Sequence, residues 1–349
     1  MSVNVGTAVG YLDLDASKFK AGLKDAQSTL SEFTNQSNNA GTRFEALGSS
    51  LKTVGSTITT AVSLPLLALG AGAIKTASDF EAGMSKVSAL SGATGDDLKM
   101  LEDKAREMGA RTKYSATESA EALSYMALAG WDAEQMAAGL EPSLKLAGAA
   151  GMDLALATDI VTDTMSMFGM EASEATKMTD MLAYAQANSN TDVQQLGEAL
   201  KYCGASANAM GYDLADTTAL LGTFADQGLK GSSAGTTLNA MFRDMKKNAK
   251  DGAIAIGDTN VAIVDANGNY RDMTDILADV EKATEGMTQA ERDMALSSVW
   301  GTEALKGVNM AFEAGVPKIR EFEDGIRKSD GAASEMYDTM QNNLQGAID

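Results

Sequence analysis

Glycine-containing turns at a regular interval constrain the fold of this 349-residue chain more than any other feature. Four of them place an acidic residue two positions after a glycine: Gly130-Trp-Asp132, Gly151-Met-Asp153, Gly169-Met-Glu171 and Gly211-Tyr-Asp213. Gly109 and Asn190 mark two similar turns, so anchors lie at 109, 130, 151, 169, 190 and 211. Successive anchors are 21, 21, 18, 21 and 21 residues apart. Each interval has room for a turn and a helix of about 15 residues.

Each turn carries residues that end one helix and begin the next. Glycine adopts the left-handed conformation that closes a helix, and the following acid caps the free N–H groups of the next one. Ser115–Glu118 and Thr191–Gln194 also fit the reciprocal capping box.

Between the turns, apolar residues recur at helical spacing. The four stripes are Leu154, Ala157, Val161, Met165 and Phe168; Ala175, Met178, Leu182 and Ala185; Val193, Leu196, Leu200 and Cys203; and Leu214, Thr217, Leu221 and Phe224. Each helix therefore has one stripe to bury, and we expect neighbouring helices to stack.

The composition favours helices along most of the chain. Ala, Leu and Met supply most of the 44% apolar residues, and only three prolines occur. We predict a mainly α fold, a multi-helix array or bundle of short capped helices in units of about 21 residues, with one small β-hairpin insertion and an N-terminal extended or helical arm. The period lies near the range of solenoid repeats, but the units differ in sequence. A repeat array and a compact bundle both remain open.

The clearest β signal lies in residues 253–272. Two turns, at Gly257-Asp258 and at 266–269, are flanked by the β-branched residues Ile254, Ile256, Val261, Ile263 and Val264. Asn-Gly between apolar runs indicates a hairpin, so we expect two or three short strands. Helices resume over Thr274–Thr284, Gln289–Val299 and Thr302–Gly315, and another begins near Ala332, so that 336–349 is the start of a further helix.

Two zones precede the helical core that we expect over residues 75–335. Residues 1–52 predict an arm with a strand followed by a polar helix. Residues 53–74 contain no charge, and their apolar positions include Leu64, Pro65, Leu66, Leu67, Leu69 and Ile74. This length is sufficient for a hydrocarbon core of roughly 30 Å, but four Thr, two Ser and three Gly dilute it. We expect packing within the protein or against a sister chain, with conditional membrane insertion as the alternative.

Charge and residue usage exclude several classes of function. The net charge of −20 opposes specific nucleic-acid binding, and the basic segment Arg243–Lys250 fits the end of a helix better than a phosphate site. The chain has no histidine and one cysteine, Cys203, which excludes an internal disulfide and the usual His/Cys metal sites. We expect a buried Cys203 and no cofactor or metal. The N-terminus lacks the pattern of a secretion signal, so we expect synthesis in the cytoplasm.

Catalytic motifs are weak throughout. Without histidine, Ser/His/Asp and Cys/His arrangements are excluded. Two carboxylates are enough to cleave a glycoside, but none of the 48 acidic residues lies in a distinctive motif, so we expect no enzymatic activity. Gly228–Gly235 lacks the GxxxxGK[ST] order of a phosphate loop. We predict a turn in which Ser232 or Ser233 caps the next helix.

Eight segments carry a further signal: Ala73–Glu81, Met108–Glu118, Ala127–Trp131, Glu198–Tyr202, Ala209–Leu214, Gly228–Leu238, Gly268–Met273 and Gly301–Leu305. In this order they resemble the core of phage tail tape measure proteins. The signature positions are Asp79, Phe80, Glu81, Gly130, Gly151, Gly169, Leu200, Lys201, Tyr202, Gly211, Gly228, Lys230, Gly231, Ser232 and Gly235.

The resemblance implies a structural protein that sets tail length during assembly and is released at infection to assist genome passage. The partners it implies are the tail tube protein, the tail assembly chaperone and tail tip or baseplate hub proteins, with self-association and contact with the host membrane at infection. It places the protein in the lumen of a virion tail or of a prophage-derived, tail-like particle, after synthesis in the bacterial cytoplasm. A membrane-inserting channel or pore component of the tail is the first alternative, and a cell-wall hydrolase is the second.

A protein that sets tail length by its own length, as a ruler, needs extended helix, which rises about 1.5 Å per residue. A compact domain of about 250 residues has a radius of gyration near 18 Å, which is bulky for the interior of a tube. We therefore expect residues 75–335 to lie at a tube end or to open into extended helices.

Overall fold

The computed structural model describes residues 59–342, with side chains from residue 75 onward. The chain divides into two units, Met1–Ile74 and Lys75–Asp349. The arm expected over 1–52 lies outside the described residues. So do the side chains of Leu64, Pro65, Leu66, Leu67, Leu69 and Ile74, whose backbone belongs to helix α3 (Thr59–Ser91). The remaining description concerns the second unit.

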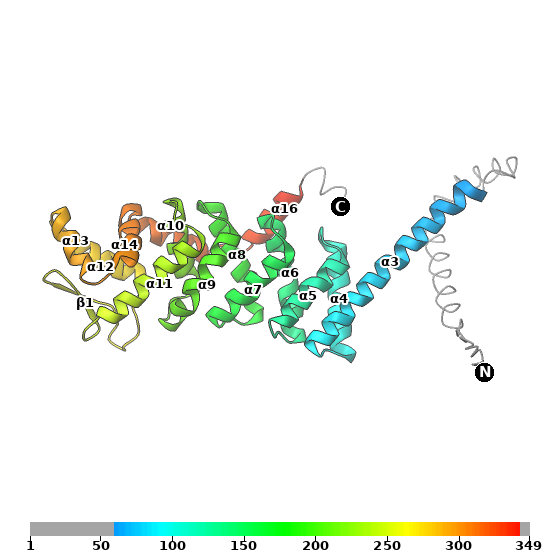
Figure 1. Ribbon diagram of the computed structural model, residues 1–349, viewed down its shortest axis with the longest axis horizontal. Coiled ribbons are helices and arrows are strands. Elements are labelled where there is room, and N and C mark those ends of the chain that lie inside the picture. Colours follow the sequence, from blue (N-terminus) through cyan, green and yellow to red (C-terminus); the bar gives the residue numbers. More distant parts are fainter. Residues whose placement is uncertain (1–58, 343–349) are drawn as a thin grey trace, which may run out of the picture. The chain divides into compact units, whose positions relative to one another are not determined.

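The described residues form a mainly α fold, with fourteen α-helices and one two-stranded hairpin. After α3, eight helices follow one another as a helical array (Figure 1): α4 (Gly95–Arg111), α5 (Ala116–Leu128), α6 (Ala133–Ala150), α7 (Leu154–Phe168), α8 (Ala175–Asn188), α9 (Val193–Ala209), α10 (Leu214–Asp226) and α11 (Gly231–Asn248). A short 3₁₀ turn, η1 (Ala172–Glu174), precedes α8.

The helical array has two layers. Each helix packs on the next one in sequence and also on the helix two positions away. As a result α4, α6, α8 and α10 form one layer, and α5, α7, α9 and α11 form the other. Of the two arrangements left open by the sequence, this is the array.

The turns of the array use the predicted glycines. Gly130, Gly151, Gly169 and Gly211 all have φ between +63° and +85°, the left-handed region. The acids that follow three of them, Asp132, Asp153 and Asp213, each accept a backbone N–H in the first turn of the next helix. The capping box of Ser115 with Glu118 is also present. The spacing of about 21 residues thus corresponds to the distance between successive turns, where one helix ends and the next begins.

Two turn predictions are wrong. Gly109 does not form a turn but lies inside α4, where a Cβ would stand 2.6 Å from the backbone nitrogen of Ala116. That glycine permits a close approach of α5. The capping box expected at Thr191 is absent: the N-cap of α9 is the next residue, Asp192, which accepts a hydrogen bond of 2.7 Å from the N–H of Gln195.

The β insertion is a hairpin of β1 (Ala253–Ile256) and β2 (Thr259–Ala262). Ile256 pairs with Thr259, so Gly257-Asp258 is the two-residue turn. The second predicted turn is closed by an isolated bridge between Val264 and Tyr270.

Five helices follow the hairpin: α12 (Met273–Ala283), α13 (Gln289–Ser297), α14 (Thr302–Ala314), α15 (Val316–Arg327) and α16 (Ala332–Gln341). Four of them begin within one residue of the predicted positions. The fifth, α15, was not predicted, although Pro317 in its first turn and the spacing of Ile319 and Ile326 are suitable signals.

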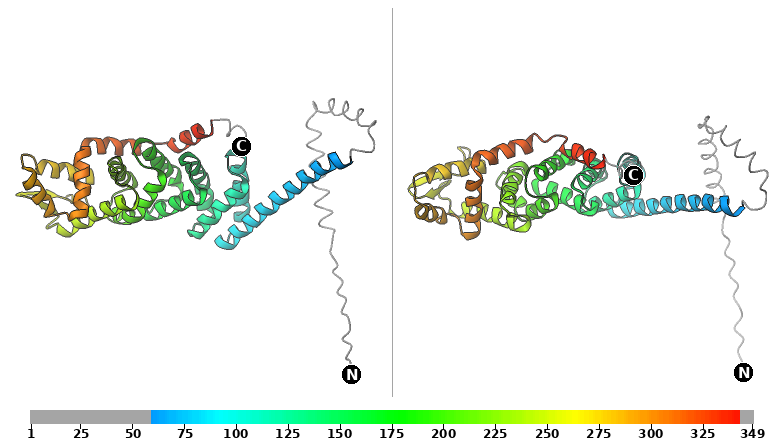
Figure 2. Two further views of the ribbon diagram at one scale, coloured as in Figure 1. Left: turned by 45° about the horizontal axis from the view of Figure 1, so that its top comes forward. Right: turned by 90° about the horizontal axis from the view of Figure 1, so that it is seen from above.

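The helices α14, α15 and α16 form what we call the return segment (Figure 2). First α14 packs on α11 and α10, next α15 packs on α10 and α8, and last α16 packs on α8 and α6. The chain therefore travels back along one layer of the array, and by α16 it packs on helices that precede it by more than a hundred residues.

The interior consists of two hydrophobic clusters. The first includes Leu101, Leu123 and Leu144, and the second includes Phe224 and Trp300. Helix α16 joins them, because its Tyr337 belongs to the first cluster and its Ala333 to the second.

The predicted stripes face these clusters, with most of their side chains buried. Cys203 is fully buried, as expected, and this burial raises the pKa of its thiol to about 12. A thiol in this state is a packing residue rather than a nucleophile.

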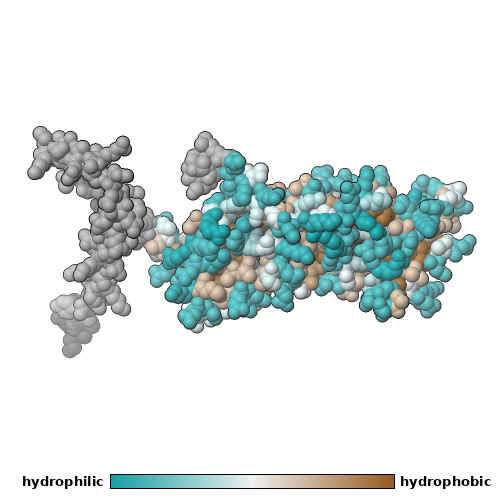
Figure 3. Space-filling view, turned by 180° about the vertical axis from the view of Figure 1, so that it is seen from behind, coloured by the Kyte–Doolittle hydropathy of each residue, from teal (hydrophilic) through white to brown (hydrophobic). Residues whose placement is uncertain are grey.

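The outer surface is mostly hydrophilic on the face seen in Figure 3, with small separate apolar areas. Among the residues described by the structure, no helix combines the length and apolar character needed to cross a membrane.

Candidate interaction site

The signature positions with the tightest geometry lie where α9 crosses α11. Gly235 of α11 is buried against the backbone of Ala199 of α9, and a Cβ added there would stand 2.8 Å from the carbonyl carbon of Ala199 and overlap its oxygen. Only glycine permits this approach. Leu200, one residue further along α9, is fully buried in the second hydrophobic cluster.

The turn before α11 contains the next signature positions. Gly228 and Gly231 have φ of +86° and +56°. Between them, the Nζ of Lys230 donates to the Oδ1 of Asn190 at 2.9 Å. The backbone N–H of Asn190 donates to Asp226 at 2.7 Å, so the turn before α9 and the turn before α11 are tied together.

The serine cap expected for α11 is wrong. The helix begins at Gly231, its N-cap is Lys230, and no side chain caps it. Because the helix already begins at Gly231, whose φ is left-handed, Ser232 and Ser233 lie within its first turn and not before it.

The other signature positions are dispersed. Gly130, Gly151, Gly169 and Gly211 each lie in a separate exposed turn of the array. On α3, Phe80 is buried beneath the guanidinium of Arg106, 4.2 Å from the ring centre, while Asp79 and Glu81 are exposed. The structure thus brings together only the positions around α9 and α11.

Lys201 and Tyr202 present an outer surface at this crossing. Tyr202 is 51% exposed, one of the few large apolar side chains left open to solvent. Lys201 forms an ion pair of 3.3 Å with Asp163 of α7. An exposed aromatic beside a charged pair is typical of a residue that contacts a partner.

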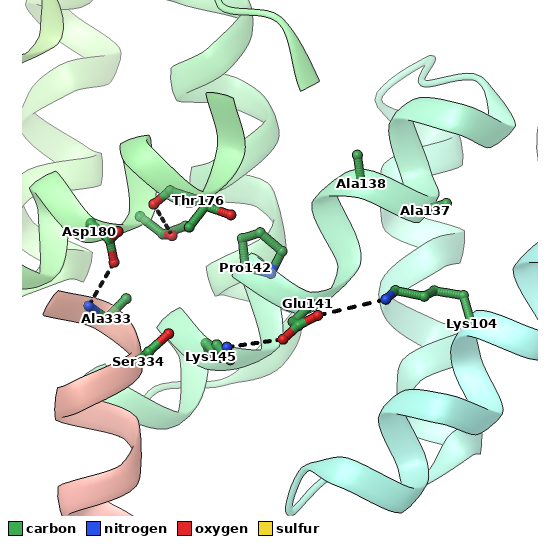
Figure 4. A pocket seen from close by; sticks show the side chains of 11 residues that line it. Lys104, Ala137, Ala138, Glu141, Pro142, Lys145, Thr176, Asp180, Ala333 and Ser334 are labelled. Atoms are coloured by element: carbon green, nitrogen blue, oxygen red, sulfur yellow. Dashed lines mark hydrogen bonds and ion pairs between the residues drawn. The ribbon is translucent and has the colours of Figure 1, made fainter. Parts of the chain in front are cut away.

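A pocket of about 280 Å³ lies between α4, α6, α8 and α16 (Figure 4). Asp180 of α8 is buried there and accepts hydrogen bonds from the backbone N–H groups of Gly331 and Ala333, at 2.8 and 2.9 Å. These N–H groups are at the start of α16, so Asp180 caps a helix 150 residues further along the chain.

The charged groups on the other wall of the pocket also join helices. Glu141 of α6 pairs with Lys145 at 3.0 Å and with Lys104 of α4 at 3.7 Å. Burial is the largest influence on the pKa of Glu141 and raises it, but the hydrogen bond from Lys145 and the charges of Lys145, Lys104 and Arg111 together leave that pKa below its usual value. The polar groups of this pocket are engaged in holding four helices together.

Tyr337 fixes the other end of α16. Its hydroxyl accepts a hydrogen bond of 2.8 Å from the backbone N–H of Lys113, and its ring lies against Gly148 of α6. We call Asp180, Tyr337 and their partners the clasp. The clasp attaches the end of the return segment to the beginning of the array.

Arg327 attaches the middle of the return segment. It lies at the end of α15 and pairs with Asp213 and Asp216 of α10 and with Glu323 of its own helix. Burial raises the pKa of Asp216 to about 7, and the neighbouring charge of Asp213 adds to the effect. Burial is the largest influence on the pKa of Asp213 and raises it, but the hydrogen bonds from Arg327 and from backbone N–H groups, together with the charge of Arg327, bring that pKa below its usual value.

The sequence patterns singled out none of the three residues Asp180, Tyr337 and Arg327. The capping rules anticipate an acid directly before a helix, whereas Asp180 caps α16 from another helix.

The model of the phage-related minor tail protein family matches residues 102–301, which run from α4 to the start of α14. The chain belongs to this family. The matched region includes the α9–α11 crossing and the turns of the array, whereas α15 and α16 lie beyond it.

Curated relatives of this phage-related minor tail protein carry tape measure names. The tape measure protein of Pneumococcus phage Dp-1 is 35% identical over 99% of this chain and 30% of its own length. The probable tape measure proteins of Escherichia phage P2 and Clostridium phage phiCD119 are 25% and 26% identical, over 75% and 57% of this chain. The chain spans about a third or less of the length of these relatives. No solved structure matches it.

Proposed function

We propose that this chain is a folded module of a tape measure protein, a structural component that sets the length of a phage tail. The observation that carries the proposal is the 35% identity to the tape measure protein of phage Dp-1 over nearly the whole chain. The three relatives are named for measuring rather than for catalysis. The polar groups around the pocket of α4, α6, α8 and α16 serve helix packing, which agrees with a structural role.

The ruler itself would be the part of the longer protein outside this module. Extended helix adds about 1.5 Å per residue to a tail, but the helices of the array are folded against one another. Releasing them would expose two hydrophobic clusters and break the clasp, at a high cost in free energy. We therefore place the module at one end of the tail tube, rather than stretched along its lumen.

The position at a tube end suggests the partners. The exposed Tyr202 and its neighbour Lys201 form the surface that we assign to the tail tube protein or to the tip and hub proteins. The tail assembly chaperone would protect the longer protein before assembly. At infection, release of the protein would assist passage of the genome, with residues 53–74 as the segment that meets the host membrane.

Two matched in-frame deletions in a phage that carries the full-length protein test this function. Tail lengths are measured by electron microscopy. A deletion of 100 residues outside this module should shorten tails by about 150 Å, whereas deletion of α4–α11 should prevent tail formation. Tails of unchanged length after the first deletion would overturn the role as a ruler.

A further inference from the structure

An open groove of about 820 Å³ runs along α15 of the return segment, beside α8 and α12. Its floor is largely apolar and is formed by Tyr184 of α8, Ala278 of α12, and Val316 and Pro317 of α15. Gly325 lies among them, and a Cβ at this position would overlap the hydroxyl of Tyr184, so the glycine leaves room for the tyrosine ring. Among the residues that the structure describes, no helix fills this groove.

The rim of the groove carries more negative than positive charge. Its charged side chains are Arg320, Lys328, Glu281, Glu321 and Asp324. Both cations are engaged, Arg320 with Asp275 and Lys328 with Asp324. Glu281 and Glu321 form no ion pair with any residue of the described part of the chain. An apolar floor beside unpaired acids fits an amphipathic helix that has basic residues next to its apolar stripe.

The N-terminal arm carries the sequence of such a helix over residues 16–30, which we call the arm helix. Its apolar residues recur at intervals of four, three and four, at Phe19, Leu23, Ala26 and Leu30. Lys20 and Lys24 each follow a residue of this stripe, so the predicted helix has both lysines along one flank. Residues 16–24 contain three lysines and no acid, in a chain with a net charge of −20.

The stripe and the groove also agree in length. The stripe from Phe19 to Leu30 and the α15 lining from Pro317 to Lys328 each extend over the same number of residues, or about 16 Å of helix. A helix laid along α15 therefore brings the whole stripe over the floor.

We propose that the arm helix of a second copy of this chain binds in the groove. Its apolar stripe covers the floor, and Lys20 and Lys24 pair with Glu281 and Glu321. We assign the arm to a second copy because the uncharged residues 53–74 that follow it also need a surface to pack on, which a sister chain supplies.

This contact joins two different surfaces, an arm and a groove, so repeated association produces a ring or an open chain of copies. The groove lies beside α8, whereas Tyr202 lies on α9 of the other layer. The surface that binds a second copy is therefore separate from the surface assigned to tail proteins.

Sedimentation velocity of the 349-residue chain measures the association. Glu281→Lys with Glu321→Lys should raise the dissociation constant by about tenfold or more, because two attractive charge pairs become repulsive. Lys20→Glu with Lys24→Glu, introduced into the same chain, should restore the affinity. Circular dichroism should show unchanged helix content in both variants, because all four changes are made in charged side chains at the proposed rim contact.

The matched control reverses two exposed acids of the other layer, by Glu121→Lys on α5 and Glu198→Lys on α9. It should leave the dissociation constant within about twofold of the wild-type value. A wild-type chain that stays monomeric, equal effects of the rim and control reversals, or no rescue by the lysine reversals would overturn the proposal.

Disulfide trapping distinguishes binding between copies from binding within one chain. A chain with Gly22→Cys in the arm helix is mixed with a chain that carries Ala278→Cys on the groove floor. Oxidation of the mixture should give a linked dimer, whereas wild-type chains, whose Cys203 is buried, should give none. If a chain with both substitutions links only to itself, the second copy is not the occupant.

Discussion

The helical array and the return segment are both helical, but they are stabilised by different kinds of contact. In the array, each helix packs on helices one and two positions away, so that contacts follow the order of the sequence. In the return segment, α15 and α16 pack on α10, α8 and α6, which lie far back along the chain. An array alone would behave as a chain of nearest neighbours.

The difference shows how the module is made into one folding unit. Without the return segment, separate parts of the array would be free to open independently. The clasp at Asp180 and Tyr337 and the ion pairs of Arg327 connect the end of the module to its beginning and middle. We expect local opening to start at the return segment, because only a few polar contacts and one face of each helix hold it on the array.

The largest effect should come from the array. Gly235→Val places a side chain against the backbone of Ala199, which has no room to receive it. We expect a loss of about 3 kcal/mol in the free energy of unfolding, measured by urea denaturation.

Gly204→Ala is the matched control on α9. Its new Cβ would meet side chains of Met167 and Phe168 at 3.2 Å, which can adjust. Because alanine favours helix, we expect a change within about 1 kcal/mol. Equal losses for both glycines would contradict the tight α9–α11 crossing.

A smaller and local effect should come from the clasp. Asp180→Ala removes the acceptor for the N–H groups of Gly331 and Ala333. We expect α16 to open more readily by about 2 kcal/mol, measured by hydrogen exchange of residues 331–341. Asp180→Asn should restore most of the protection, because asparagine also caps helices. Equal loss of protection in α9 and α16 would mean that the return segment does not open separately.

The hydroxyl of Tyr337 should contribute less. Tyr337→Phe keeps the ring beside Gly148 but removes the acceptor for the N–H of Lys113. We expect a local loss of about 1 kcal/mol, seen as faster exchange at Lys113 and in α16. Unchanged exchange at both places would show that the ring alone holds α16.

The smallest effect on stability is expected on the outer face of the array. Tyr202→Ser alters a half-exposed side chain and should change the free energy of unfolding by no more than about 0.5 kcal/mol. Under the proposed function, the same change should reduce the yield of complete tails. A normal yield would remove Tyr202 from the partner surface.

The sequence left the array and the bundle both open, but it predicted most helices and turns of the array well because their determinants are local. Helical spacing alone identifies Val193, Leu196, Leu200 and Cys203 as one buried face, and the left-handed glycines identify the turns. Local rules also explain the errors. Gly109 has the composition of a turn but serves a close approach to α5, and Thr191 and Asp192 are both suitable caps.

The candidate site could be predicted only in part. The segments around Leu200 and Gly235 are recognisable in the sequence, but their crossing depends on two helices meeting. The clasp and the Arg327 cluster were not predictable, because Asp180 and Ala333, or Arg327 and Asp213, meet only after the return segment has folded back.

The most direct test of the account is photo-crosslinking in assembled tails. A benzophenone side chain introduced at Ser334, which lines the pocket with Ala138 and Glu141, reports whether α16 lies on α6. We predict the same crosslink from position 334 to α6 in the free chain and in intact tails. Loss of that link in tails, with new links to tube subunits, would contradict a module that stays folded at the tube end.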